Sequence, residues 1–146
     1  MRALLVCCAL ILAGCGSGGG SSEAARPVES HLRALSENDF AGACSELTLE
    51  AQGDVIGLVA QADGRRRSCP DAYRSLVMTG SLDFARAGVM DVARAQHYGR
   101  SAADVVVDST NGAHAQAHVS GSRKVIYLER GGDGWKISRL DFTDLP

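Results

Sequence analysis

Two hydrophobic periods divide the chain. Between about residues 27 and 80, apolar residues recur at intervals of three and four, the spacing that places them on one face of a helix. From residue 104 onward, apolar and polar residues alternate, which is the spacing of a strand with one buried face. A helical half followed by an antiparallel meander predicts an α+β fold, with N-terminal helices packed on one face of a curved antiparallel four-stranded sheet.

Residues typical of helix ends mark the helices of the first part. The first helix is expected to follow Pro27, where the ordered region opens, and to bury Val28 and the apolar residues spaced from it. Asp39 and Thr48 are placed to cap the second and third helices with their side-chain oxygens. Gly64 supplies the C-terminal stop of the third helix.

A fourth helix is predicted to begin around Pro70, which a first helical turn tolerates, and to end near Gly80. The pattern then weakens up to residue 99. Phe84 and Val89 fit a short helix there, but Gly88 disfavours it.

The last part of the chain predicts four strands joined by turns. The strands are expected at residues 104–108, 113–119, 125–129 and 135–140. Asn111-Gly112 predicts a tight turn between the first two, and the glycine-rich residues 131–134 predict a hairpin loop between the last two.

The N-terminus has the pattern of an export signal. One basic residue, Arg2, precedes an apolar run from Ala3 to Ala13. This run is too short to span a bilayer, which needs about 20 apolar residues, but it has the length of a signal-peptide hydrophobic region. The sequence GSGGGSS follows at residues 16–22 and cannot bury enough apolar surface to fold, so it predicts a flexible linker.

Between the apolar run and the linker, the sequence Leu12-Ala13-Gly14-Cys15 resembles the lipobox of bacterial lipoproteins. The resemblance implies transfer of diacylglycerol to the Cys15 thiol and cleavage before it. The chain then divides into a signal peptide (1–14), a lipidated cysteine with its linker (15–26) and one domain (27–146). Acyl chains would attach the protein stably to the extracytoplasmic face of the cell membrane. The alternative is an ordinary secretory signal with a chance cysteine.

The count of cysteines follows from this division. Of the five cysteines, Cys7 and Cys8 leave with the signal peptide and Cys15 is lipidated, so Cys44 and Cys69 remain. In an oxidising extracytoplasmic space these two are expected to form a disulfide. A catalytic or metal-binding pair is the weaker alternative, because there is no C-x-x-C and no histidine at zinc-finger spacing.

The charge balance is mildly acidic, with 15 Lys and Arg against 17 Asp and Glu. A nucleic-acid-binding protein would need a clustered basic face, so no nucleic-acid partner is predicted. The one basic cluster, Arg65 to Arg67, follows Gly64 and is expected to face water at a helix C-terminus. Contact with anionic lipid headgroups is the alternative.

The order of these parts is similar to that of the nuclear transport factor 2-like superfamily, in the form found on actinobacterial lipoproteins. The segments that carry the resemblance are HLRALSENDFAGACSEL, CPDAYRSL, VVVDSTNGAHAQAHV and VIYLERGGDGWKISRL, which lie between residues 31 and 140. The resemblance implies a cone-shaped α+β domain, and Cys44 and Cys69 match the helix-to-helix disulfide of such lipoproteins. Residues 84–100 depart from the usual pattern.

That superfamily contains ketosteroid isomerases and polyketide cyclases as well as non-catalytic modules, so the fold alone does not decide the function. An isomerase site needs a carboxylate base and acidic donors that converge inside an apolar cone. Asp39 matches the acidic position of the cyclase-like members, but helix capping also explains it. Packing explains Tyr73 and Tyr127, whereas Tyr98 in the weakly patterned segment is unexplained. No convergent catalytic set is evident, so the sequence predicts no catalytic residues.

His114 and His118 are four residues apart, but the strand pattern argues against a shared metal ion. In a strand rising about 3.3 Å per residue they would lie roughly 13 Å apart. With Gln116 they form a polar stripe opposite small apolar residues, which is expected to face solvent. A ligand or partner surface that includes Tyr98, His114 and His118 is the alternative.

The sequence therefore favours a lipid-anchored accessory or binding module of the bacterial cell envelope, without catalytic activity, cofactor or metal. Its partners would be the membrane, through Cys15, and an unidentified small ligand or envelope protein. The alternatives are a small isomerase-like or cyclase-like enzyme that uses the cone interior, and a protein-interaction module that uses the open sheet face. An interior filled by Phe40, Leu47, Trp135 and Ile137 would argue against the enzyme, and a large apolar patch on the sheet would indicate the interaction module.

Overall fold

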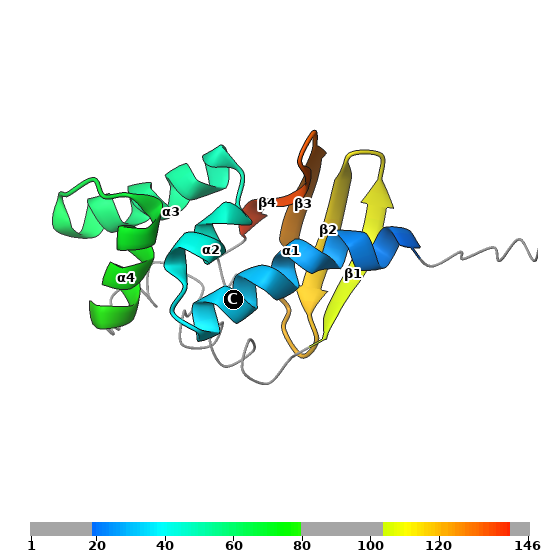
Figure 1. Cartoon of the computed structure of the whole chain (residues 1–146), viewed down its shortest axis with the longest axis horizontal. Helices are drawn as coiled ribbons and strands as arrows, with labels where there is room; N and C mark the ends of the chain where they lie inside the picture. The colour runs from blue at the N-terminus through cyan, green and yellow to red at the C-terminus, as the bar shows by residue number, and fades with distance from the viewer. Residues whose placement is uncertain (1–18, 80–103, 141–146) are drawn as a thin grey trace, which may run out of the picture.

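The computed structural model describes residues 19–79 and 104–140, which form an α+β arrangement of four helices followed by a four-stranded antiparallel sheet (Figure 1). The helices are α1 (Gly19–Ser36), α2 (Phe40–Ser45), α3 (Leu49–Asp63) and α4 (Cys69–Thr79). The strands are β1 (Val105–Asn111), β2 (His114–Val119), β3 (Ile126–Gly131) and β4 (Gly134–Leu140). The predicted α+β class, with helices followed by a four-stranded antiparallel sheet, is confirmed. The short helix expected around Phe84 and Val89 lies outside the described residues.

The start of the first helix differs from the prediction. The linker was expected to extend to residue 26, but α1 already begins at Gly19, and Pro27 lies inside it. Ala24 and Val28 are 0% and 1% exposed, so the apolar face that continues to Leu32 begins a turn before the proline. Alanine is the best helix former, and burial of this face outweighs the backbone hydrogen bond that proline cannot make.

The sheet is a meander in the order β1-β2-β3-β4, and α1 crosses one of its faces (Figure 1). The alternation predicted for β2 is confirmed. Ala115 and Ala117 are 4% and 0% exposed beneath the helix layer, whereas His114 and Gln116 are exposed on the opposite face.

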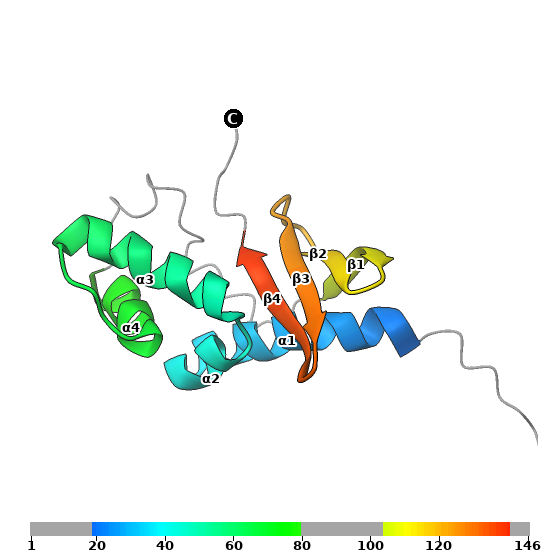
Figure 2. The same ribbon diagram turned by 90° about the horizontal axis from the view of Figure 1, so that it is seen from above.

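The prediction that the helices as a group pack on one face of the sheet is wrong, because α1 covers that face and the other helices lie beside the sheet (Figure 2). Figure 2 shows α3 and α4 beyond the β4 edge. A short parallel bridge between Leu47 and Ile137 joins this edge to the α2–α3 connection. The Thr48 amide donates to the Ile137 carbonyl at 2.8 Å, and the Ile137 amide donates to the Glu46 carbonyl at 2.9 Å. This bridge fixes the beginning of α3 against β4.

The predicted N-caps of α2 and α3 and the predicted end of α3 are confirmed. The Asp39 carboxylate accepts from the Gly42 amide at 2.9 Å, and the Thr48 hydroxyl accepts from the Ala51 amide at 3.2 Å. Gly64 ends α3 with a φ of +73°, a left-handed conformation that glycine adopts without steric penalty.

Thr48→Ala is expected to lower the free energy of unfolding by about 1 kcal/mol, because the first turn of α3 loses its side-chain acceptor. Urea denaturation at neutral pH measures this change. Thr48→Ser keeps the hydroxyl and is the matched control, so it should retain most of the stability. Equal destabilisation by the two substitutions would show that the threonine methyl group, and not the cap, is responsible.

The predicted disulfide between Cys44 and Cys69 joins α2 to α4, with the two Cα atoms 6.2 Å apart. Both residues are buried, at 5% and 4% exposure. The bond therefore ties the outermost helix to the helix that packs against α1.

Candidate functional site

The space between the helices and the sheet is filled by apolar side chains. Phe40, Leu47 and Trp135 are each at most 7% exposed, and Ile137 is fully buried. Among the described residues, His31 is the one buried side chain of the charged or strongly polar types. Of the residues that the structure describes, His31 and the groups that it contacts are therefore the candidates for acid–base chemistry in the interior.

His31 on α1 is held by two hydrogen bonds to other helices. Its Nδ1 lies 2.8 Å from the Ala43 carbonyl of α2, which can only accept, so Nδ1 carries the proton. The neutral ring then accepts at Nε2 from the Tyr73 hydroxyl of α4, at 3.4 Å. Burial lowers the pKa of His31 to about 4 and raises the pKa of Tyr73 above its usual value. Both groups are uncharged at neutral pH, and they join three helices within the core.

The sheet face opposite α1, called the open face here, carries two cross-strand rows of polar side chains. The strand pairing places Ser109, Gln116, Tyr127 and Arg139 in the first row, one residue from each strand. It places Asn111, His114, Glu129 and Lys136 in the second. Adjacent strands lie about 4.8 Å apart, so neighbouring side chains in a row can contact a common ligand.

A hollow of about 930 Å³ lies over this open face. Its floor consists of both rows except Lys136, together with neighbouring residues of β2, β3 and β4. Its wall is the beginning of α3, where Glu50 and Asp54 are four residues apart and lie on one side of the helix. The Leu47–Ile137 bridge at the β4 edge positions this wall.

The hollow carries an excess of negative charge. Its lining includes the carboxylates of Glu50, Asp54 and Glu129 and the guanidinium of Arg139. Within the described part of the chain, none of these four side chains has an ion-pair partner. Lys136 is opposite Glu129 in the strand register, but its Nζ donates to the Ser45 carbonyl at 2.6 Å instead.

The predicted surface residues are only partly brought together. His114 lines the hollow, and Gln116 lies beside it on the floor. His118 is on the same face but outside the hollow, where its Nδ1 lies 2.9 Å from Oδ2 of Asp108, at a bulge of β1. Tyr98 and Cys15 lie outside the described residues.

Two further predictions from the sequence concern metal ions and the arginine cluster. Across residues 19–79 and 104–140, no group of three His, Cys, Asp or Glu side chains is arranged to hold a metal ion. Arg65 and Arg66 are exposed after α3, as expected for a solvated helix end. Arg67 forms an ion pair with Asp63.

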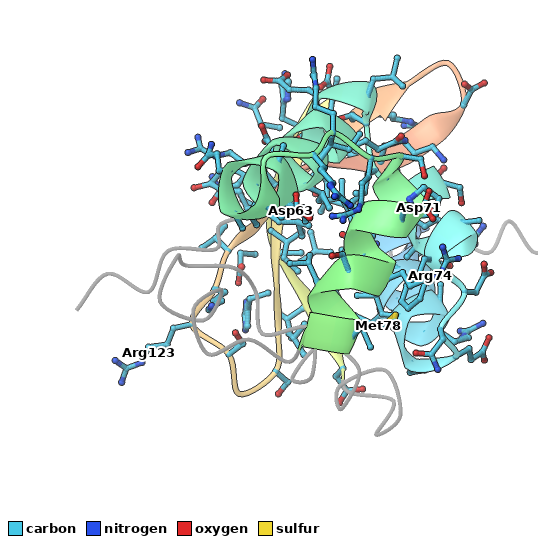
Figure 3. The ribbon with its side chains drawn as sticks, turned by 90° about the vertical axis from the view of Figure 1, so that its left-hand side faces the viewer. Asp63, Asp71, Arg74, Met78 and Arg123 are labelled. Atoms are coloured by element: carbon cyan, nitrogen blue, oxygen red, sulfur yellow. A yellow bond between two sulfur atoms is a disulfide. The ribbon has the colours of Figure 1, made fainter. Side chains whose placement is uncertain are left out.

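At the far end of the molecule, α4 presents a charged outer side. Figure 3 shows Asp71, Arg74 and Met78 along this helix, with Asp63 on the neighbouring α3. Asp71 forms an ion pair with Arg74, whose guanidinium lies 5.9 Å from the centre of the Phe40 ring. Met78 is 78% exposed. α4 packs mainly against α2 and α3, and none of its residues lines the hollow.

None of the charged residues of the hollow was predicted from the sequence to belong to a site, and neither was Tyr127. These charged residues are Glu50, Asp54, Glu129 and Arg139. The alternation in the third strand could have indicated the orientation of Tyr127. Ile126 and Leu128 are buried, so the residue between them faces the opposite side of the sheet. The position of α3 beside β4 has no comparable local pattern.

Comparisons with protein-family models, with curated proteins and with solved structures found no match to this chain. In the part of the chain that the structure describes, no helix has both the length and the apolar character needed to cross a membrane.

Proposed function

We propose that the protein is a lipid-anchored, extracytoplasmic binding module of the bacterial cell envelope, and that its ligand occupies the hollow over the open face. The observation that carries this proposal is the contrast between the two sides of the sheet. The side under α1 is filled by apolar residues, whereas the other side presents ordered polar groups around about 930 Å³ of open space. Sites that bind small ligands are concave and contain a few convergent polar groups.

The anchor rests on the N-terminal sequence. Leu12-Ala13-Gly14-Cys15 supplies the lipobox, and the apolar run before it supplies the export signal. The Cys44–Cys69 disulfide supports an oxidising compartment, since such bonds are rare in the cytosol.

We interpret the domain as a nuclear transport factor 2-like cone, on the order of its parts: helices first, then a four-stranded meander crossed by α1. Two observations favour a binding module over the other functions of such folds. The filled interior, in which His31 is neutral and hydrogen-bonded, disfavours an isomerase-like or cyclase-like site. The polar character of the open face disfavours a protein-interaction module built on an apolar patch.

Cys15→Ala is expected to abolish processing and lipidation, because the thiol is the group to which diacylglycerol is transferred. In membrane fractionation of the producing bacterium, the variant should appear as an unprocessed precursor or as soluble protein. Cys8→Ala removes a cysteine from the apolar run and is the matched control, so it should remain processed and membrane-bound. A cleaved Cys15→Ala protein that stays in the membrane fraction would overturn the anchor.

A further inference from the structure

We propose that the hollow over the open face binds compact basic zwitterions, which carry two or more amino groups and one carboxylate, such as lysine-type amino acids and short basic peptides with a free C-terminus. The proposal rests on the proposed function, because it names the ligand class of the same site.

The order of the charges across the hollow carries this inference. Glu50 and Asp54 stand on α3, which packs against β4, and Arg139 projects from β4 itself. Glu129 follows on β3, the next strand. One positive position is therefore flanked by negative positions on both sides.

The complement of this pattern is a ligand with one negative group between two positive groups. A ligand carboxylate would pair with the Arg139 guanidinium, whose planar fork matches it. One ligand amino group would then face Glu129, and another would face the carboxylates on α3. Such a ligand would give a partner of opposite charge to each of the four charged side chains that line the hollow.

The structure also explains why these charges are left for a ligand. Lys136 is the natural cross-strand partner of Glu129, but its Nζ is bonded to the Ser45 carbonyl. A β-bulge separates Arg139 from Glu129 in the strand register, and the two form no ion pair. Glu50 and Asp54 have like charges four residues apart, an arrangement that destabilises a helix and that a cation would relieve.

The neutral lining suits the same ligand class. Tyr127 is half-buried in the floor, between Gln116 and Arg139 in its row, and offers an aromatic surface to methylene groups or a cation. The Gln116 and Asn111 amides can both donate and accept hydrogen bonds. An apolar ligand would instead desolvate four charged groups without giving them partners, which is unfavourable.

Isothermal titration calorimetry of the full-length protein in detergent, with lysyl-lysine and with its C-terminal amide as probes, tests the proposal. Saturable binding of lysyl-lysine is expected at millimolar concentration or below. Glu129→Gln should weaken the binding of both probes about fivefold, because both carry the amino groups that would pair with Glu129. Arg139→Gln should weaken lysyl-lysine about fivefold but not the amide, which has no carboxylate. These side chains are exposed, so the variants should fold.

Glu37→Gln is the matched control, because it removes the same charge from an exposed position after α1, outside the hollow. It should leave both affinities unchanged. Three outcomes would overturn the ligand class: no binding of lysyl-lysine, equal weakening by Glu37→Gln, or an Arg139→Gln effect that is the same for acid and amide. Binding of a neutral oligosaccharide in place of lysyl-lysine would also overturn it. None of these outcomes alters the fractionation result for Cys15→Ala, so the two proposals fail separately.

Discussion

Replacing Cys44 and Cys69 together by alanine is expected to lower the free energy of unfolding by about 3.5 kcal/mol, on the chain-entropy model for this loop. The cysteines are 25 residues apart, and their bond holds α4 to α2. α4 packs on the other helices and makes no extensive contact with the sheet. The disulfide therefore restrains the helix that the sheet does not hold. For a small domain, a loss of this size is a large part of the total stability.

Urea denaturation without reductant measures this loss. The wild-type protein with reductant is the control and should unfold at nearly the same urea concentration as the double variant. Titration of the unfolded, unreduced mature protein should find no free thiol. Two reactive thiols, or a double variant as stable as the wild type, would contradict the prediction.

Acidification from about pH 6.5 to pH 4 is expected to lower the free energy of unfolding by roughly 3 kcal/mol through His31 alone. Burial lowers the pKa of His31 from 6.5 in the unfolded chain to about 4 in the folded protein. Between these values the unfolded chain binds the proton and the folded protein does not, so stability rises with pH across this window. Below about pH 4 both states are protonated, and the effect of His31 levels off.

Urea denaturation at a series of pH values checks this dependence, with His31→Gln as the informative variant. Glutamine can still donate to the Ala43 carbonyl but does not titrate, so the slope between pH 4 and 6.5 should flatten. Tyr73→Phe keeps His31 and should keep the slope.

Hydrogen bonds lower the pKa values of the Asp63 and Asp71 carboxyls below their ordinary value of 3.8. The stabilisation of the fold by these two carboxylates is therefore lost at lower pH than that of His31. An unchanged slope in His31→Gln would assign the acid sensitivity to other groups.

Local patterns predicted the elements because local interactions determine them. The Asp39 and Thr48 caps each bond an amide three residues ahead, so the interaction is visible within a few letters of sequence. The alternation in β2 likewise predicted which side chains face solvent, since successive residues of a strand point to opposite faces. The start of α1 was predicted wrongly, because the burial of this helix depends on a sheet that begins only at Val105, far along the chain from Ala24.

The candidate site was less accessible to prediction. His114 was identified from the strand alternation, and it lines the hollow. Glu50 and Asp54 belong to a helix that, in the sequence, is simply an amphipathic segment with a polar side. Nothing near them indicates that Glu129 and Arg139 lie across from that side.

The sequence by itself determined the two halves of the fold, the caps of α2 and α3, the solvent-facing stripe of β2 and the cysteine pair, because periodicity, capping and cysteine number are local or countable properties. Only the tertiary structure decided that His31 would be buried between Ala43 and Tyr73, and that Glu50 and Asp54 of α3 would line the same hollow as Glu129 and Arg139. The physical reason is that these groups meet through packing and through the Leu47–Ile137 bridge, which joins segments 90 residues apart. Contacts of that range depend on how whole elements fit together, and no short stretch of the chain encodes them.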